Sequence, residues 1–236
     1  MKKALIIIPA YNEESSIRAV VDDVATTISG CDGYKIDVLV VDDGSSDGTR
    51  ERALEAGVNV ISLPVNLGIG GAVQTGFCHA LRYGYDYAVQ VDGDGQHDAA
   101  DIKMLLNTLE RESVDFVIGS RFKDSGDYKP SLPRKIGMRF SRQLLYLGTG
   151  KRVLDTTSGF RAINRRMIEF FAANYATMFA GVTSLALAFR NGFTFVEVPA
   201  RFHYRQFGAS SINWVKAVFY PFQVSLAVLE VLLRKR

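Results

Sequence analysis

Short apolar runs alternate with longer stretches of helical spacing through the first half of the chain. Five runs have the length of a strand: residues 4–8, 37–41, 58–63, 87–91 and 115–119. Four stretches between them place apolar residues on one face of a helix: residues 14–28, 47–56, 69–83 and 99–111. This alternation predicts a parallel sheet with helices on both faces. Ligands bind such sheets beyond the carboxyl ends of the strands, so the chemistry is expected just after each run.

The second half of the chain has a less regular pattern. Residues 121–152 are basic and loop-rich before they become helical, and residues 166–190 have helical spacing throughout. One more strand is expected at residues 193–198, and a polar segment rich in arginine and aromatic residues follows at 199–212. Because no repeat or low-complexity tract divides the chain, residues 1–212 are expected to form one α/β domain.

The last segment, residues 213–236, is apolar apart from a narrow polar stripe. The stripe consists of Asn213, Lys216, Tyr220, Gln223, Ala227, Glu230 and Arg234. Charges and Pro221 interrupt the apolar run, which favours an amphipathic helix on a membrane surface over one that spans a bilayer. The alternatives are a helix packed on its own domain and a contact helix between two copies of the chain, which would give a homo-oligomer. The basic ending, Arg234-Lys235-Arg236, suits anionic lipid headgroups.

Composition and charge narrow the class of protein. The chain has 236 residues, 47% of them apolar, and only two cysteines, which excludes a disulfide scaffold and favours a reducing compartment. Residues 1–120 hold 9 Lys and Arg against 19 Asp and Glu, whereas residues 121–236 hold 19 against 6. An acidic half suits a metal-bound nucleotide, and a basic half suits phosphates or an anionic membrane. Nucleic acid is not an expected partner, because the acidic half would repel it.

Two carboxylates and an amide stand at alternate positions after the fourth run. Asp92, Asp94 and Gln96 are expected to project to one side as the chain leaves its strand. Gly93, between them, lets the backbone come close to a ligand. The pattern indicates Mg²⁺ or Mn²⁺ bound through oxygen ligands together with a diphosphate. The alternative, an aspartate that caps the next helix, accounts better for Asp98.

The first two runs are also followed by candidate ligand groups. Pro9, Tyr11 and Glu13 follow the first run, and Asp42 and Asp43 follow the second. A flat aromatic ring and a carboxylate hold a nucleobase by stacking and by accepting its N–H. These two turns therefore predict a nucleoside site.

A glycine-rich loop opens the helix after the third run. Gly68, Gly70 and Gly71 could admit a phosphate at the helix N-terminus, or could serve close packing of helix on sheet. The spacing matches neither the dinucleotide fingerprint nor a Walker A loop, which disfavours an oxidoreductase or a P-loop enzyme. His97, in the acidic turn, is expected to pack or hydrogen-bond rather than bind the metal.

Six motifs occur in order within residues 7–161: IPAYNEE, VVDDGSSDGT, NLGIGGA, DGDGQH, GSRF and DTTSGFR. Together they resemble family 2 glycosyltransferases of the GT-A fold, and most of all the dolichyl and polyprenyl-phosphate sugar synthase branch. The resemblance implies a Rossmann-like, mostly parallel sheet flanked by helices. Residues 1–120 would form its nucleotide-binding half, residues 121–212 its acceptor half and residues 213–236 the C-terminal helix.

The implied activity is inverting, metal-dependent sugar transfer from a UDP- or GDP-sugar to a polyprenyl phosphate. The enzyme would be peripheral on the cytoplasmic face of the membrane. The family positions matched for the nucleotide sugar are Pro9, Tyr11, Glu13, Asp42, Asp43, Gly70, Asp92 and Gly93, and those matched for the metal are Asp92, Asp94 and Gln96. The expected catalytic residues are Asp94, Arg121 and Asp155, and the expected acceptor or phosphate ligands are Arg121, Arg134, Arg139, Ser158, Arg161 and Arg205.

The sequence departs from the family pattern at three places. Ser211 stands where a lysine is usual, and Ile69 stands where many relatives have a lysine. Residues 181–184 (GVTS) have no carboxylate where relatives often have a glutamate. A sugar hydroxyl needs a carboxylate base, whereas a lipid phosphate is already an anion, so this departure favours a phosphate acceptor. Asp155 as the base is the alternative.

Two other functions stay open on the sequence alone. One is a glycosyltransferase of the same fold that extends a polysaccharide or lipid-linked glycan at a hydroxyl. The other is a catalytically silent sugar-nucleotide-binding protein.

Overall fold

The computed structural model describes residues 1–123, 132–176, 178–203 and 214–233; of these, 132–134 and 214–222 are described by their backbone alone. Seven strands of the described residues form one sheet in the order β3-β2-β1-β4-β6-β5-β7. The strands are β1 Lys2–Ala10, β2 Tyr34–Asp42, β3 Asn59–Ser62, β4 Tyr87–Gln90, β5 Phe116–Ser120, β6 Arg161–Asn164 and β7 Phe195–Pro199. β6 runs antiparallel to both of its neighbours, β4 and β5, and the other pairs are parallel.

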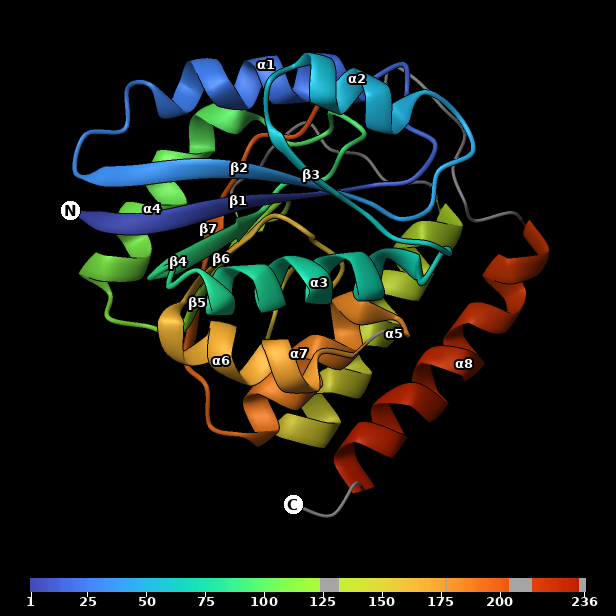
Figure 1. Ribbon diagram of the computed structural model, residues 1–236. Helices are drawn as coiled ribbons and strands as arrows, with labels where there is room; N and C mark the ends of the chain where they lie inside the picture. The colour runs from blue at the N-terminus through green and yellow to red at the C-terminus, as the bar shows by residue number, and fades with distance from the viewer. Residues whose placement is uncertain (124–131, 177, 204–213, 234–236) are drawn as a thin grey trace.

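Helices cover both faces of the sheet (Figure 1). They are α1 Ile17–Ile28, α2 Thr49–Glu55, α3 Gly68–Arg82, α4 Ile102–Arg111, α5 Leu132–Thr149, α6 Arg165–Asn174, α7 Ala180–Arg190 and α8 Trp214–Leu233, and a short 3-10 turn, Ala99–Asp101, precedes α4. One layer contains α1, α2 and α4, and the other contains α3 and α6 with α5, α7 and α8 beyond them. The alternation of strands and helices in the first half confirms the expected α/β fold.

The alternation of side chains along β1 explains why this strand is apolar from Ala4 onward. Ile6 and Ile8 pack with α1 and α4 on one face, and Leu5 and Ile7 pack with α3 on the other. Both faces of a parallel strand are buried in such a fold, so the run shows no polar alternation. A Cβ at Gly76 of α3 would collide with the side chain of Ile7, so this glycine lets α3 lie close to the sheet.

β6 was not expected from the sequence, which predicted no strand between residues 119 and 193. It contains only four residues, Arg161 to Asn164, with polar side chains at both ends. Too few apolar positions are present to show a period of two. The strand exists because it fills the gap between β4 and β5, and its antiparallel direction makes the sheet mixed rather than purely parallel.

The stretch expected to be helical from residue 166 to residue 190 is two helices, α6 and α7. The side chain of Asn164 caps α6 by accepting a hydrogen bond from Met167 N–H at 2.9 Å. Tyr175, after the last turn, is extended, and Phe179 takes a positive φ of 50° immediately before α7. A bulky residue at positive φ is uncommon, and here it turns the chain sharply into the new helix.

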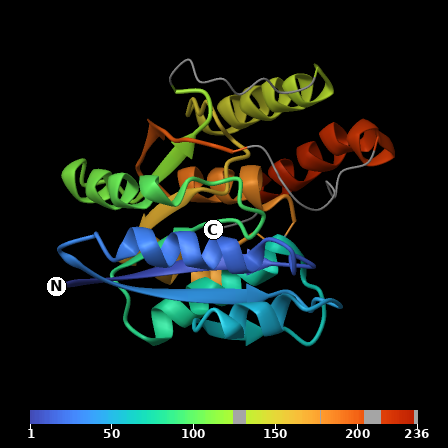
Figure 2. The ribbon, with the colours of Figure 1, turned by 90° about the horizontal axis from the view of Figure 1, so that it is seen from above.

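α8 packs against α5 and α7 (Figure 2). Val224 and Val228 are fully buried in the same core as those helices, whereas Leu226, Leu229 and Leu233 are exposed. Gly148 of α5 lies against Leu232, where a Cβ would collide. No helix in the described ranges is long and apolar enough to cross a membrane.

Asp115 ties together three strands at the edge of the sheet where β5 begins. Its carboxylate accepts hydrogen bonds from Thr194 N–H at 2.8 Å, Arg166 at 2.9 Å and Asn164 at 3.1 Å. Thr194 precedes β7, and Asn164 ends β6. Burial by itself would raise the pKa of Asp115, but these hydrogen bonds outweigh it and hold the pKa below its usual range.

We expect Asp115→Asn to lower the free energy of unfolding by about 1–3 kcal/mol at pH 7, because a buried charged acceptor loses its bonds. A depressed folded-state pKa stabilises the protein above the unfolded-state pKa of about 3.9. That stability is lost as the pH falls through the folded-state pKa. The difference between wild type and variant should therefore shrink below about pH 4, measured by urea unfolding at several pH values. An equal difference at every pH would contradict this account.

Candidate functional site

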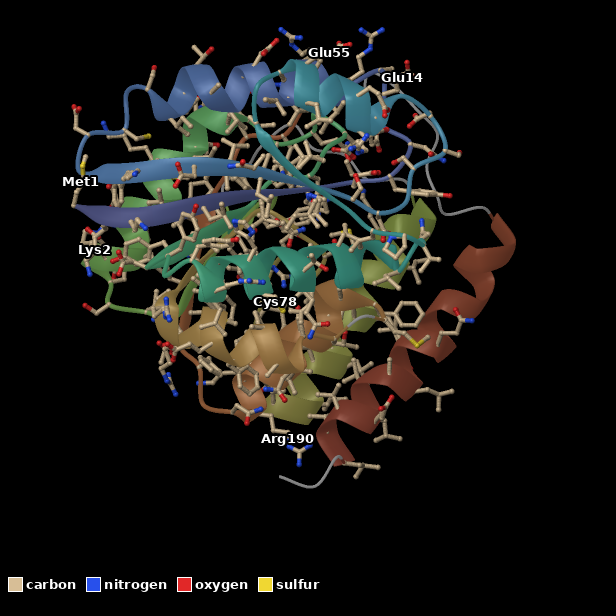
Figure 3. All side chains as sticks on the ribbon, viewed as in Figure 1. Met1, Lys2, Glu14, Glu55, Cys78 and Arg190 are labelled. Carbon is tan, nitrogen blue, oxygen red and sulfur yellow. The ribbon has the colours of Figure 1, made fainter. Side chains whose placement is uncertain are left out.

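The turns after β1 and β2 are bonded to each other at the carboxyl edge of the sheet. Asp43 N–H donates to the carbonyl of Ala10 at 2.8 Å, and Asn12 N–H donates to Ser45 Oγ at 3.0 Å. Glu13 N–H donates to Thr49 Oγ1 at 2.8 Å. Figure 3 labels Glu14, which follows this turn, at the side of the molecule opposite to Met1 and Lys2.

Asp42 and Asp43 are both buried, with 3% of each residue exposed. Asp42 Oδ1 accepts Ser45 N–H at 3.0 Å, and Asp43 Oδ1 accepts Leu67 N–H at 2.8 Å. Asp43 thereby fixes the loop that opens α3, and burial raises its pKa. Tyr11 lies beside them with 47% of its surface exposed, which leaves a flat ring open to a ligand.

At least one glycine at the start of α3 is required for close packing. A Cβ at Gly71 would strike the side chain of Leu67 in the same turn. Gly70, the glycine expected to approach the nucleotide sugar, is buried in the first turn of α3. Its contact with a phosphate stays a prediction.

Asp92 is held from three sides. Gln90 Nε2 donates to its Oδ1 at 2.9 Å, and His97 Nε2 lies 3.6 Å from its Oδ2. A Cβ at Gly159 would lie 2.8 Å from both carboxylate oxygens, so only glycine leaves room for this carboxylate. Gly93, next in the turn, lies close to Pro9. A Cβ added at Gly93 would be 3.1 Å from the Pro9 carbonyl oxygen.

His97 is a packing and hydrogen-bonding residue, as expected. Its Nδ1 accepts Asp92 N–H at 3.0 Å, which leaves Nε2 to carry the proton that faces Asp92. The ring stacks on Phe160 at 4.8 Å and meets Phe202 edge-on at 5.1 Å. Burial lowers the pKa of His97 and favours the neutral ring.

Asp94 lines a cavity of about 310 Å³ between the acidic turn and α1. Asp94 Oδ1 accepts Gln96 N–H at 3.1 Å, and the Gln96 carbonyl accepts His203 N–H at 2.8 Å. Both of these contacts use backbone atoms of Gln96. That its side-chain amide binds a metal ion therefore stays a prediction.

The donor set of the acidic turn fits a hard divalent cation. Asp92 and Asp94 supply carboxylates two positions apart, and no group of three His, Cys, Asp or Glu side chains in the described ranges could hold a metal ion. Mg²⁺ and Mn²⁺ are commonly bound by one or two carboxylates, with phosphates and water as the other ligands. Such an ion would thus depend on a bound diphosphate for the rest of its shell.

Arg121, directly after β5, and Asp155 form a buried ion pair. Arg121 Nε and Nη2 each lie 2.7 Å from one oxygen of Asp155, and Nη2 also donates to Thr157 Oγ1 at 2.8 Å. Glu197 of β7 accepts Leu154 N–H at 2.7 Å and Asp155 N–H at 2.8 Å, which positions the backbone of this loop. Burial alone would raise the pKa of Asp155, but the Arg121 guanidinium holds it below its usual range. Asp155 as a general base stays a prediction.

Ser158 and Arg161 are buried against the protein. Ser158 Oγ donates to the Gly119 carbonyl at 2.6 Å. Arg161 donates to Ser184 Oγ and the Gly181 carbonyl, both at 2.9 Å, and burial lowers its pKa. These contacts are structural, and phosphate binding by either residue stays a prediction.

The other three arginines expected at the acceptor site are placed unequally. Arg139 is exposed on α5, and Arg134 belongs to the part of α5 described by its backbone alone. Arg205 lies outside the described residues, as does Ser211. The first turn of α7 contains no acidic residue, which agrees with the missing carboxylate at residues 181–184.

Sequence reasoning missed four residues that shape the site. Ser16 Oγ lies 2.9 Å from both the Glu13 carboxylate and the Gly93 carbonyl, which links the turn after β1 to the acidic turn. Glu197 of β7 accepts the N–H of Asp155, and Phe202, in the segment after β7, packs against His97. Only Gly159 carried a signal, because it belongs to the DTTSGFR motif.

The chain matches the model of the family described as glycosyl transferase family 2 over residues 5–171. It is 32% identical over 226 residues to the polyprenol monophosphomannose synthase of Mycolicibacterium smegmatis, covering 90% of this chain and 82% of the relative. It is 31% identical over 230 residues to the UDP-N-acetylglucosamine–dolichyl-phosphate N-acetylglucosaminyltransferase of Methanococcus voltae, covering 87% and 88%. It is 33% identical over 224 residues to the undecaprenyl-phosphate mannosyltransferase of Micrococcus luteus, covering 89% and 88%.

Solved structures of glucosyl-3-phosphoglycerate synthase from Mycobacterium tuberculosis have the same fold. The complex with Mn²⁺, UDP and phosphoglyceric acid has a TM-score of 0.76 at 19% identity and covers 100% of this chain and 80% of that chain. A complex with Mg²⁺ and UDP has a TM-score of 0.72. This likeness shows the GT-A fold.

The matched region includes both halves of the site, the acidic turn and the Arg121–Asp155 pair. The chain therefore belongs to glycosyltransferase family 2 and is a glycosyltransferase.

Proposed function

We propose that the enzyme transfers a sugar from a nucleotide diphosphate sugar to a polyprenyl phosphate, with inversion at the anomeric carbon. The observation that carries this proposal is the chemistry of the acceptor side. There Asp155 is paired with Arg121, Glu197 binds backbone N–H groups, and the first turn of α7 contains no acidic residue. A phosphate acceptor needs no carboxylate base, because it attacks as an anion. The three relatives named above, whose names give polyprenyl, dolichyl or undecaprenyl phosphate as the lipid, support the same acceptor class.

On the donor side, Tyr11 would stack on the nucleobase while Asp42 and Asp43 accept its N–H or a ribose hydroxyl. Asp92 and Asp94 would hold Mg²⁺ or Mn²⁺, which neutralises charge on the leaving diphosphate. Gly93 lets the donor approach the backbone beside Pro9. Gln90 and His97 orient the Asp92 carboxylate.

The surface made by α5 and α8 fits a membrane carrying anionic lipids. Ile136, Phe140 and Leu147 of α5 and Leu226 and Leu229 of α8 are exposed. The sequence of α5, Leu132–Thr149, contains basic residues and no acidic one. Exposed apolar side chains with basic neighbours bind the interface of an anionic bilayer. This surface would bring the site to a lipid-borne acceptor.

The activity test measures nucleotide diphosphate release from UDP- and GDP-sugars with Mn²⁺, with and without undecaprenyl phosphate. We expect release that depends on the lipid phosphate and falls at least about a hundredfold in Asp94→Asn, because charge on the leaving group loses its stabilisation. Asp86→Asn, which alters a carboxylate bonded to Lys3 N–H near the start of β4, is the matched control with unchanged activity. Release that is indifferent to the lipid would instead favour a hydroxyl acceptor, and no release with any donor would favour a silent binding protein.

Gly159→Ala tests the close fit against Asp92. The added Cβ would lie 2.8 Å from the carboxylate oxygens, so Asp92 has to turn away from the donor site. We expect kcat to fall at least about tenfold, with little change in thermal stability if the side chain moves alone. Gly30→Ala is the control, because its Cβ meets only an ordinary contact at 3.7 Å. Wild-type kinetics in Gly159→Ala would refute the assigned role of this glycine.

Membrane binding is tested by co-sedimentation with vesicles of anionic lipids. Leu226→Gln with Leu229→Gln removes two apolar side chains from the exposed face of α8, and we expect the partition coefficient to fall at least about tenfold. Leu54→Gln on α2 is the control, because Leu54 is similarly exposed, at 46% against 52% for Leu226, on the opposite layer. Equal binding by the double variant and the control would overturn this assignment of the surface.

A further inference from the structure

Two arginines share one aromatic ring beside the acceptor site. The Phe122 ring, one residue after Arg121, has the Arg142 guanidinium 4.9 Å from its centroid and that of Arg121 at 5.9 Å. Arg121 also lies 5.1 Å from the centroid of Phe202. Because Phe202 contacts His97, and His97 contacts Asp92, the stack runs without a break from α5 to the acidic turn. Of the α5 arginines whose side chains the structure describes, Arg142 thus lies in this stack, whereas Arg139 is exposed.

The two arginines differ in how their charge is balanced. Arg121 has Asp155 as a partner at 2.7 Å. Arg142 forms no ion pair with any carboxylate in the described part of the chain, and its Nε is buried there without a hydrogen-bond acceptor. The neighbouring Ser141 Oγ is also buried without a partner. The helix itself offers no compensation, because Leu132–Thr149 contains no acidic residue.

A partly buried, unpaired guanidinium costs stability unless an anion binds to it. The Phe122 ring lies against the guanidinium and restricts its rotamers, which leaves less rotamer freedom to lose when a ligand binds. A planar fork of N–H donors matches the oxygens of a phosphate. The Arg142 guanidinium therefore has the properties of a phosphate-binding group, and it lies next to the Arg121–Asp155 pair.

We propose that Arg142 binds the phosphate of the prenyl phosphate acceptor. This inference rests on the proposed function and adds to it the residue that recognises the acceptor. Arg142 was not among the candidate residues from the sequence, because nothing in the one-dimensional pattern separates it from the other basic residues of α5.

The experiment compares wild type, Arg142→Gln and Arg142→Lys with a short, micelle-free acceptor, farnesyl phosphate. We expect Arg142→Gln to raise the KM for farnesyl phosphate about ten- to hundredfold, as for loss of a charged hydrogen bond, with the KM for the donor unchanged. Arg142→Lys keeps the charge without the planar fork and should restore part of the affinity. Arg165→Gln is the control for loss of one positive charge, because Arg165 pairs with Glu169 on α6. Melting temperatures of all variants exclude a folding defect as the cause.

Equilibrium binding of farnesyl phosphate and of farnesol without donor separates the possible failures. Binding of the phosphate by wild type, weakened in Arg142→Gln and absent for farnesol, supports the proposal. Equal binding by wild type and Arg142→Gln overturns the role of Arg142 and leaves the proposed function standing. No binding of the phosphate by wild type overturns both. Loss of anionic-vesicle binding in Arg142→Gln, with the farnesyl phosphate KM unchanged, would assign the residue to bulk headgroups and also overturn the proposal.

Discussion

The buried pair of Arg121 and Asp155 is the interaction on which the proposed acceptor side of the site depends. Arg121 directly follows β5, and Asp155 belongs to a loop whose backbone is bonded to Glu197 of β7. Removal of one partner from a buried pair costs about 3–5 kcal/mol, since the other charge is left without compensation. The pair also sets the position of the Phe122 and Phe202 rings, and Phe202 supports His97 beneath the acidic turn. One ion pair thus joins β5, β7 and the donor-side turn.

The two sides of the site handle charge in opposite ways. On the donor side, Asp92 and Asp94 stand at a turn where a cation and a diphosphate can complete their coordination. On the proposed acceptor side, Arg121 is paired with Asp155, Arg161 donates hydrogen bonds to Ser184 and the Gly181 carbonyl, and Arg142 lies against the Phe122 ring. Under the proposed function, the site would present negative charge to a metal ion and a limited amount of positive charge to the acceptor.

The sequence predicted the parts of the fold whose causes are local. The strands β1 to β5 are recognisable in the sequence as apolar runs. Ligand groups follow the ends of parallel strands, and this rule pointed to Asp42 and Asp92 as candidate site residues. The antiparallel β6 was not predicted, because a strand of four residues with polar side chains at both ends shows no hydrophobic periodicity. Glu197 was not predicted as a site residue because it lies inside a strand. Its carboxylate accepts the N–H of Asp155, which is 42 positions earlier in the chain. Contacts of that range depend on tertiary packing, which periodicity does not encode.

The direction of β6 has a consequence for how such enzymes can diversify. β5 and β6 are antiparallel neighbours, with Ile118 opposite Arg161, so residues 121–160 leave the sheet and return to it at the same edge. The free energy of closing a loop grows slowly with its length, so insertions in the exposed turns of this excursion would have little effect on the strand order. Leu145 and Val153 are buried in the main core, so α5 itself has to keep its packing. The excursion holds α5 and the Arg121–Asp155 pair, whereas the nucleotide turns lie outside it. If the proposed function holds, this excursion carries the acceptor-side residues Arg121, Arg142 and Asp155, and the residues assigned to the donor lie outside it.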